Sequence, residues 1–104
     1  MEAAQARLDD LVTLADRADD MVDRWSAGEF TASADEGRIV ATTDALGSLL
    51  SLDISPVSRR RLDAVELADA ILTAVVAAED AAAASKDELM EDLRAAQRSI
   101  ERRS

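Results

Sequence analysis

The residues that interrupt regular secondary structure are confined to the middle of this sequence. All three glycines and the single proline lie between Gly28 and Pro56, and both flanks are free of helix breakers. Alanine, the strongest helix former, is abundant on both sides. The sequence therefore predicts a helix, a short non-helical segment and a second, longer helix.

Residues 2–25 are predicted to form an amphipathic helix. Apolar side chains recur there at three- and four-residue steps, while aspartates occupy the other faces. The segment from Ser26 to Gly28 is expected to end this helix, because glycine readily adopts the backbone conformation of a C-cap. The apolar positions of the repeat are Leu8, Leu11, Val12, Ala15, Ala18, Val22 and Trp25.

Three short strands are predicted in the middle third, over about 29–33, 38–43 and 48–54. Turn residues at 35–37 and 44–47 separate them and are short enough to make an antiparallel meander. In the second strand Ile39, Ala41 and Thr43 are expected to share one side.

The third strand is expected to place Leu50, Leu52 and Ile54 on one face. Leu49 then points the other way, unless a β-bulge lets it join the core. Pro56 ends the sheet, since proline cannot donate to a strand ladder.

A long helix is predicted over about 64–102. Asp63 and Glu66 have the spacing of a capping box at its start. Without a break it would contain about 39 residues and measure roughly 58 Å. Ser85 and Glu88 fit a second capping box, so the sequence leaves open whether the helix is interrupted there.

The expected architecture is a single α+β domain over 1–104 that works as a dimer. Alanine buries little area, so a monomeric core would be thin, and the distal apolar residues of the long helix need a partner. Trp25 and Phe30 are expected to pack under the sheet or at a subunit interface. The interface candidates are Trp25, Phe30, Leu50, Leu52 and Ile54.

Composition argues against an enzyme. The chain contains no cysteine and no histidine, and it shows no glycine-rich phosphate loop and no nucleophile motif. Carboxylate pairs at i, i+4 occur, but without histidine or a fixed loop they are poor metal sites. We expect no cofactor, no metal and no small-molecule substrate. The absence of a long apolar stretch or a signal sequence predicts a cytoplasmic protein that does not enter the membrane.

Charge is distributed unevenly along the chain. The net charge is −10, yet the last twelve residues carry four arginines and one glutamate. Arg94, Arg98 and Arg102 follow one another at i, i+4 and i+8, which places them in one stripe on a helix, and Arg103 adds to the same end. The stripe either contacts phosphates or compensates the helix macrodipole. The macrodipole would explain Arg102 and Arg103, in the last helical turn, better than Arg94.

A second basic group, Arg59, Arg60 and Arg61, lies between the sheet and the long helix. Adjacent guanidinium groups can grip a phosphate backbone. The competing interpretation is a solvated loop whose arginines pair with nearby carboxylates such as Asp63 and Glu66, and this is the more common outcome.

The segment from Gly37 to Pro56, GRIVATTDALGSLLSLDISP, resembles the core hairpin of the YbaB/EbfC family of nucleoid-associated proteins. The similarity extends over roughly 28–84. Ala45 stands where the family's turn often has glycine. Further positions that resemble the start of the family's C-terminal helix are Leu67, Ala68, Ala70, Ile71, Ala74 and Ala78.

The resemblance implies a tight homodimer with projecting helices that binds double-stranded DNA with little sequence preference, in the nucleoid. Charge and position then nominate two groups of phosphate contacts, Arg94, Arg98, Arg102 and Arg103 first, and Arg59, Arg60 and Arg61 second. The net charge opposes DNA binding at long range. The alternative is therefore an acidic protein-interaction module without DNA binding, such as a chaperone-like partner in a type VII secretion system, as some relatives are.

Overall fold

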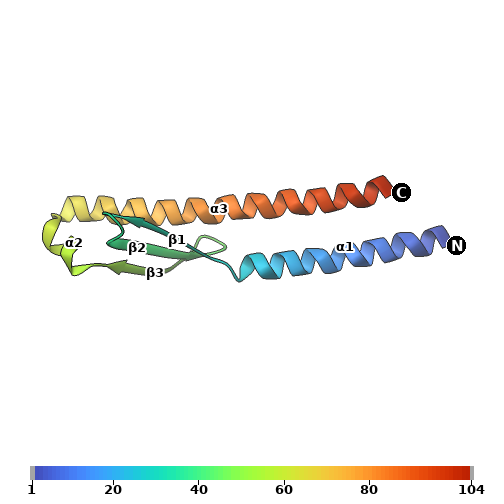
Figure 1. Ribbon diagram of the computed structural model, residues 1–104, viewed down its shortest axis with the longest axis horizontal. Coiled ribbons are helices and arrows are strands. Elements are labelled where there is room, and N and C mark those ends of the chain that lie inside the picture. The colour runs from blue at the N-terminus through green and yellow to red at the C-terminus, as the bar shows by residue number, and fades with distance from the viewer. Residues whose placement is uncertain (1, 104) are drawn as a thin grey trace.

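The computed structural model describes the backbone of residues 2–103 and the side chains of residues 8–99, 101 and 102. It contains a helix, a three-stranded sheet, a short helix and a long helix in chain order (Figure 1). This is the predicted α+β order. The elements are α1 (Glu2–Ser26), β1 (Glu29–Ala34), β2 (Ile39–Asp44), β3 (Leu49–Ile54), α2 (Pro56–Arg61) and α3 (Ala64–Arg103).

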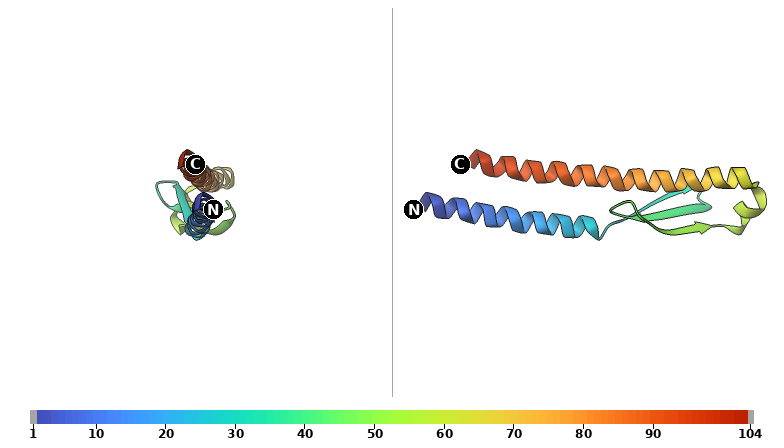
Figure 2. Two further views of the ribbon diagram at one scale, coloured as in Figure 1. Left: turned by 90° about the vertical axis from the view of Figure 1, so that its right-hand side faces the viewer. Right: turned by 180° about the vertical axis from the view of Figure 1, so that it is seen from behind.

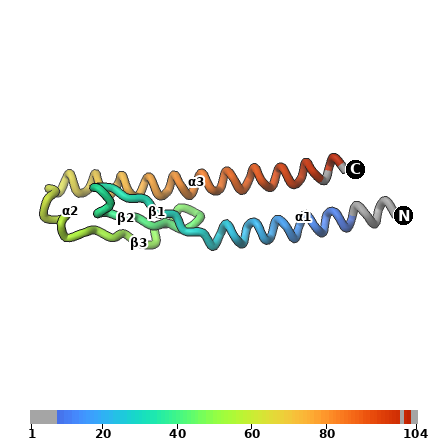
Figure 3. The backbone as a smooth tube through the Cα atoms, viewed as in Figure 1, coloured from blue at the N-terminus to red at the C-terminus, as the bar shows by residue number. Residues whose placement is uncertain are grey.

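The molecule is a rod built along α3. It measures 73 × 18 × 16 Å. Its radius of gyration of 20.7 Å compares with about 13 Å for a compact chain of this length. The sheet packs against the first half of α3, and α1 lies antiparallel beside the second half, so that both chain ends are at one tip (Figures 1 and 2). We call this pair of helices the helical arm; Figure 3 shows its backbone path.

The sheet is an antiparallel meander in the order β1-β2-β3. Ile39, Ala41 and Thr43 are buried on one face of β2, as predicted. The register between β2 and β3 shifts after Thr42, where a bulge places Leu49 opposite Thr43. Leu50 is consequently exposed and does not share the half-buried face of Leu52 and Ile54. The expected alignment of these three residues is therefore wrong at Leu50.

The core is small and depends on alanine. Ile39 and Ala41 of β2 meet Ala74 and Ala78 of α3, and all four are fully buried. Because a methyl group keeps the helix close to the strands, α3 packs tightly across β1 and β2. It covers β3 less, and the apolar side chains of Leu49 and Leu50 lie about half exposed.

The sequence did not predict α2. Pro56 occupies its first turn, where the missing N–H is harmless, and the Ser55 hydroxyl accepts a bond from the Val57 N–H at 3.2 Å. The helix spans only six residues, Pro56–Arg61, too few to show periodicity. The arginine run therefore belongs to a helix and not to the expected loop.

The start of α3 is capped as predicted. The Glu66 N–H donates to the Asp63 carboxylate at 2.8 Å, and the Asp63 N–H donates to the Glu66 carboxylate at 3.3 Å. The backbone bond lowers the pKa of Asp63 below its usual value. From there α3 continues for 40 residues without interruption at Ser85.

Only part of the predicted apolar face of α1 meets α3. Ala18 and Trp25 are half-buried beside it, together with Leu14 and Met21, which the predicted repeat omitted. The apolar residues of α1 extend around about half of the helix circumference at 100° per residue, so more than one face was possible. The predicted residues left exposed are Leu8, Leu11, Val12, Ala15 and Val22.

Candidate nucleic-acid interface

The arginine stripe, defined as Arg94, Arg98 and Arg102, lies on the helical arm and points away from α1. Leu89 lines a cavity between the two helices. Nine residues at 100° each put Arg98 about half a turn away from Leu89, and Arg94 and Arg102 flank Arg98 by about 40°. All three side chains are exposed. The stripe is therefore a surface open to a ligand that approaches the outer side of α3.

One carboxylate holds two of these arginines. Glu91 accepts from Arg98 at 3.1 Å and lies 3.7 Å from Arg94. All three side chains are more than half exposed, and exposed ion pairs of this kind contribute about 0–1 kcal/mol. A phosphate can therefore displace Glu91 at little cost. The side chain of Arg103, also predicted as a contact, lies outside the described residues.

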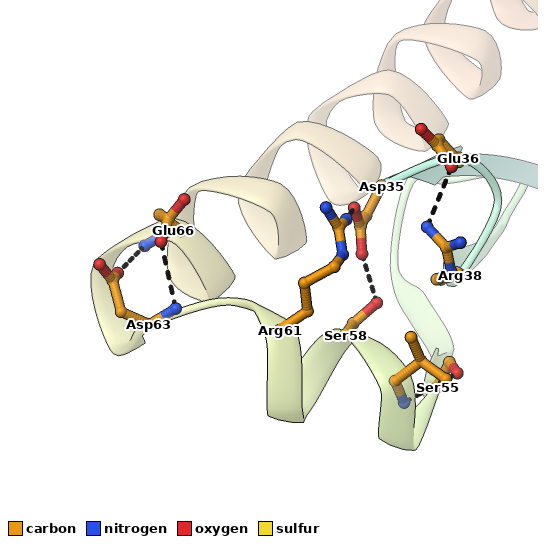
Figure 4. Close-up of polar contacts among 9 residues, drawn as sticks. Asp35, Glu36, Arg38, Ser55, Ser58, Arg61, Asp63 and Glu66 are labelled. Atoms are coloured by element: carbon orange, nitrogen blue, oxygen red, sulfur yellow. Dashed lines mark hydrogen bonds and ion pairs between the residues drawn. The ribbon is translucent and has the colours of Figure 1, made fainter.

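The second basic group lies at the opposite tip of the rod, where α2 connects the sheet to α3 (Figure 1). Arg61 forms an ion pair with Asp35 in the β1–β2 turn, and the Ser58 hydroxyl donates to the same carboxylate at 2.5 Å (Figure 4). Ser58 is fully buried. Arg61 thus fastens α2 to the sheet.

The expected pairing of the arginine run with Asp63 and Glu66 is not observed, because those two carboxylates cap α3. Arg59 and Arg60 remain exposed. The structure therefore separates the two predicted arginine groups along the rod.

Asp35 and Ser58 were not identified from sequence, although they position α2. They are 23 residues apart and form no motif. The sequence marks Asp35 just as a turn residue beside Gly37, and its φ of 51° in the structure is one that aspartate tolerates better than most residues.

The predicted interface candidates occupy different environments. Leu52 and Ile54 pack partly against the core of the same chain, and Phe30 is half-buried. Trp25 lies at the base of the helical arm, where its ring lines an open cavity of about 390 Å³ between α1 and α3. Its indole N–H is buried and has no hydrogen-bond partner among the described residues. Leu50 is the most exposed of the five.

Neither a membrane-spanning helix nor a cluster of metal ligands occurs in the described part of the chain. No helix there is long and apolar enough to span a bilayer. No group of three or more carboxylates within it is gathered as a metal site.

Comparison with known proteins identifies a family and a fold. The family model of the YbaB/EbfC DNA-binding family matches residues 1–97. Among solved structures, the uncharacterized protein HP0035 from Helicobacter pylori superposes with a TM-score of 0.66 at 14% identity. The alignment covers 80% of this chain and 87% of that one. At this identity the similarity establishes the fold alone. No curated protein sequence matches.

Proposed function

The chain belongs to the YbaB/EbfC DNA-binding family, and from that premise we propose that it is a nucleoid-associated protein that binds double-stranded DNA as a homodimer through the arginine stripe. The role is binding without a catalytic step. The observation that supports this surface is the exposure of all three arginines on the side of α3 opposite α1.

The helical arm explains how an acidic chain can accept DNA. Five exposed aspartates of α1 repel phosphates, whereas the arginine stripe occupies the opposite side of the same arm. DNA therefore approaches along the outer side of α3. Guanidinium groups contact phosphate oxygens, which carry no direct sequence information, so binding depends little on sequence. The aspartates are Asp9, Asp16, Asp19, Asp20 and Asp23.

The homodimer is supported by the surface that one chain leaves uncovered. The accessible surface is 7246 Å², against about 5,700 Å² for a compact protein of this mass. The excess of about 1,500 Å² exceeds the roughly 800 Å² that each partner buries in a standard interface. Exposed apolar side chains lie on the edge strand β3, namely Leu49 and Leu50, which α3 covers little. A second copy that packs here would thicken the alanine-rich core.

Light scattering tests the dimer. At micromolar concentration we expect a mass of about twice 11.1 kDa. Replacing both Leu49 and Leu50 with glutamine should shift the mass toward the monomer, because these side chains are about half exposed in one chain and buried in the proposed pair. A monomeric mass for the unmodified protein would contradict the proposal.

DNA binding is tested by a salt series. If both protomers use the stripe, six phosphate contacts give a slope of log K against log salt of about −5. Changing Arg94, Arg98 and Arg102 to glutamine should abolish most of that slope.

The control changes Arg17, Arg24 and Arg38 to glutamine, which removes the same charge elsewhere. It should lower affinity much less. No binding at about 50 mM salt would rule out the function. Equal losses in the two variants would show that net charge, and not the stripe, governs binding.

A further inference from the structure

The helix α1 carries an apolar surface that the chain itself does not use. Its inner side contacts α3 through Leu14, Ala18, Met21 and Trp25. A second set, which we call the outer stripe, lies alongside and faces solvent. Its members are Leu8, Leu11, Val12, Ala15 and Val22, and the exposed fractions of the four larger residues are 57%, 51%, 60% and 40% respectively.

The outer stripe continues into a notch. Leu11 belongs to both, because it also lines an opening of about 350 Å³ between α1 and α3. Leu14, Ala18 and Leu93 form the apolar part of its wall, and Gln97 and Glu101 complete it. From Leu8 to Val22 the stripe extends about 21 Å along the helix. Apolar residues at this spacing, beside an opening that accepts a large side chain, fit an amphipathic helix laid alongside.

The charge beside the outer stripe determines what kind of helix it accepts. At 100° per residue, four aspartates form a band that borders the outer stripe on the side away from α3, namely Asp9, Asp16, Asp20 and Asp23. Asp19 lies within the outer stripe itself. All five are exposed, and none of their carboxylates joins an ion pair among the residues whose side chains are described. The four aspartates of the band and Asp19 therefore offer five carboxylates without an ion pair among the described side chains, next to an apolar surface.

We propose that the outer stripe and its aspartate band form a docking surface for a basic amphipathic helix of a partner protein. Lysines or arginines on the flank of that helix would meet the aspartates, while its apolar face covers the stripe. The α1 helix of a second copy does not fit, since it would bring the same aspartates against these. DNA is repelled for the same reason. The surface is separate from β3 and from the arginine stripe, so the proposal goes beyond DNA binding.

The probe is a labelled peptide of about 18 residues, roughly 27 Å as a helix, with leucines at i, i+3, i+4 and i+7 and lysines elsewhere. Its fluorescence anisotropy should show saturable binding to the full-length protein. A peptide of the same composition with scrambled leucines should bind at least tenfold more weakly, because it keeps the charge and loses the apolar face. A peptide with glutamates in place of the lysines should not bind.

The matched variants are Leu8→Gln with Val12→Gln on the outer stripe, and Leu46→Gln on the β2–β3 turn as a control. All three residues are more than half exposed, so folding is not at risk. The double variant should bind the lysine peptide roughly tenfold or more weakly, since two apolar contacts are removed without a change in charge. The control should bind as the unmodified protein does.

Several results would overturn the proposal. The first is that the lysine peptide shows no saturable binding. The second is that the scrambled peptide binds as tightly as the lysine peptide, and the third is that the double variant binds the lysine peptide as tightly as the unmodified protein does. A change in the mass of the double variant in light scattering would assign the outer stripe to the homodimer instead. Weakened DNA binding by the double variant would assign it to the nucleic-acid interface.

Discussion

The contacts that hold α2 against the β1–β2 turn predict how much stability is lost when Asp35 is replaced. Its side chain is only 8% exposed and accepts from both Ser58 and Arg61. In Asp35→Ala, the buried Ser58 hydroxyl loses its acceptor, which costs about 1–3 kcal/mol. Alanine also fits the left-handed backbone at φ 51° less well, by about 1 kcal/mol. The half-exposed Arg61 adds at most about 1 kcal/mol.

The expected loss in the free energy of unfolding is therefore about 3 kcal/mol, or roughly 12–24 °C in Tm at 4–8 °C per kcal/mol. Asp35→Asn tolerates the turn and still offers Ser58 an oxygen, so it should lose only about 1 kcal/mol. Urea unfolding at one fixed protein concentration measures both, because a dimer's midpoint depends on concentration.

The adjacent residue supplies the control. Glu36 also has a positive φ, 58°, but its side chain is largely exposed and pairs with Arg38 at the surface. Glu36→Ala should change the free energy of unfolding by less than about 1 kcal/mol. If Asp35→Ala and Glu36→Ala have the same effect, the buried Ser58 bond does not stabilise the tip and the reasoning fails.

Two further predictions concern α3. Ala78→Leu should destabilise the fold by about 1–3 kcal/mol because the buried methyl group has no room to grow, whereas Ala77→Leu on the exposed side should be nearly neutral in the same urea assay. The pKa of Asp63 is lowered chiefly by the bond from the Glu66 N–H, so its stabilising effect is complete above the ordinary value of 3.8 and is lost as the pH falls through the lower folded value. Asp63→Asn should remove this contribution, so in acid the free energy of unfolding of the unmodified protein should fall toward that of the variant. A difference in free energy between the two proteins that stays unchanged down to about pH 2 would contradict the assigned cap.

The element order was predictable because the helix breakers cluster. Gly28, Gly47 and Pro56 separate the elements. The Asp63–Glu66 capping box marks the start of α3, and it could be recognised because its partners are just three residues apart in the sequence. A β-bulge beside Leu49 was one of two alternatives left open by the sequence, since alternation alone admits two registers, and the structure shows the bulge. For α1, apolar residues cover about half of the circumference, and only the position of α3 decides which part is inside.

The site was predictable to a different degree. The arginine stripe follows from helical spacing, and the structure shows it exposed. Its ligand follows from family membership and not from spacing. The role of Arg61 was not predictable, because Asp35 and Ser58 come together only through the fold. Sequence also gave no reason to separate Arg59 and Arg60 from Arg61.

The continuity of α3 fixes the arginine stripe in rotation as well as in distance. The helix is one piece of 40 residues that packs on the sheet at one end and carries the stripe at the other. Inserting one residue beyond the sheet would advance the stripe by only about 1.5 Å but turn it by about 100° toward the flank of the arm. Insertions or deletions in this helix therefore keep the stripe on the same side of the arm when they comprise about seven or eleven residues, because these lengths are close to whole numbers of helical turns.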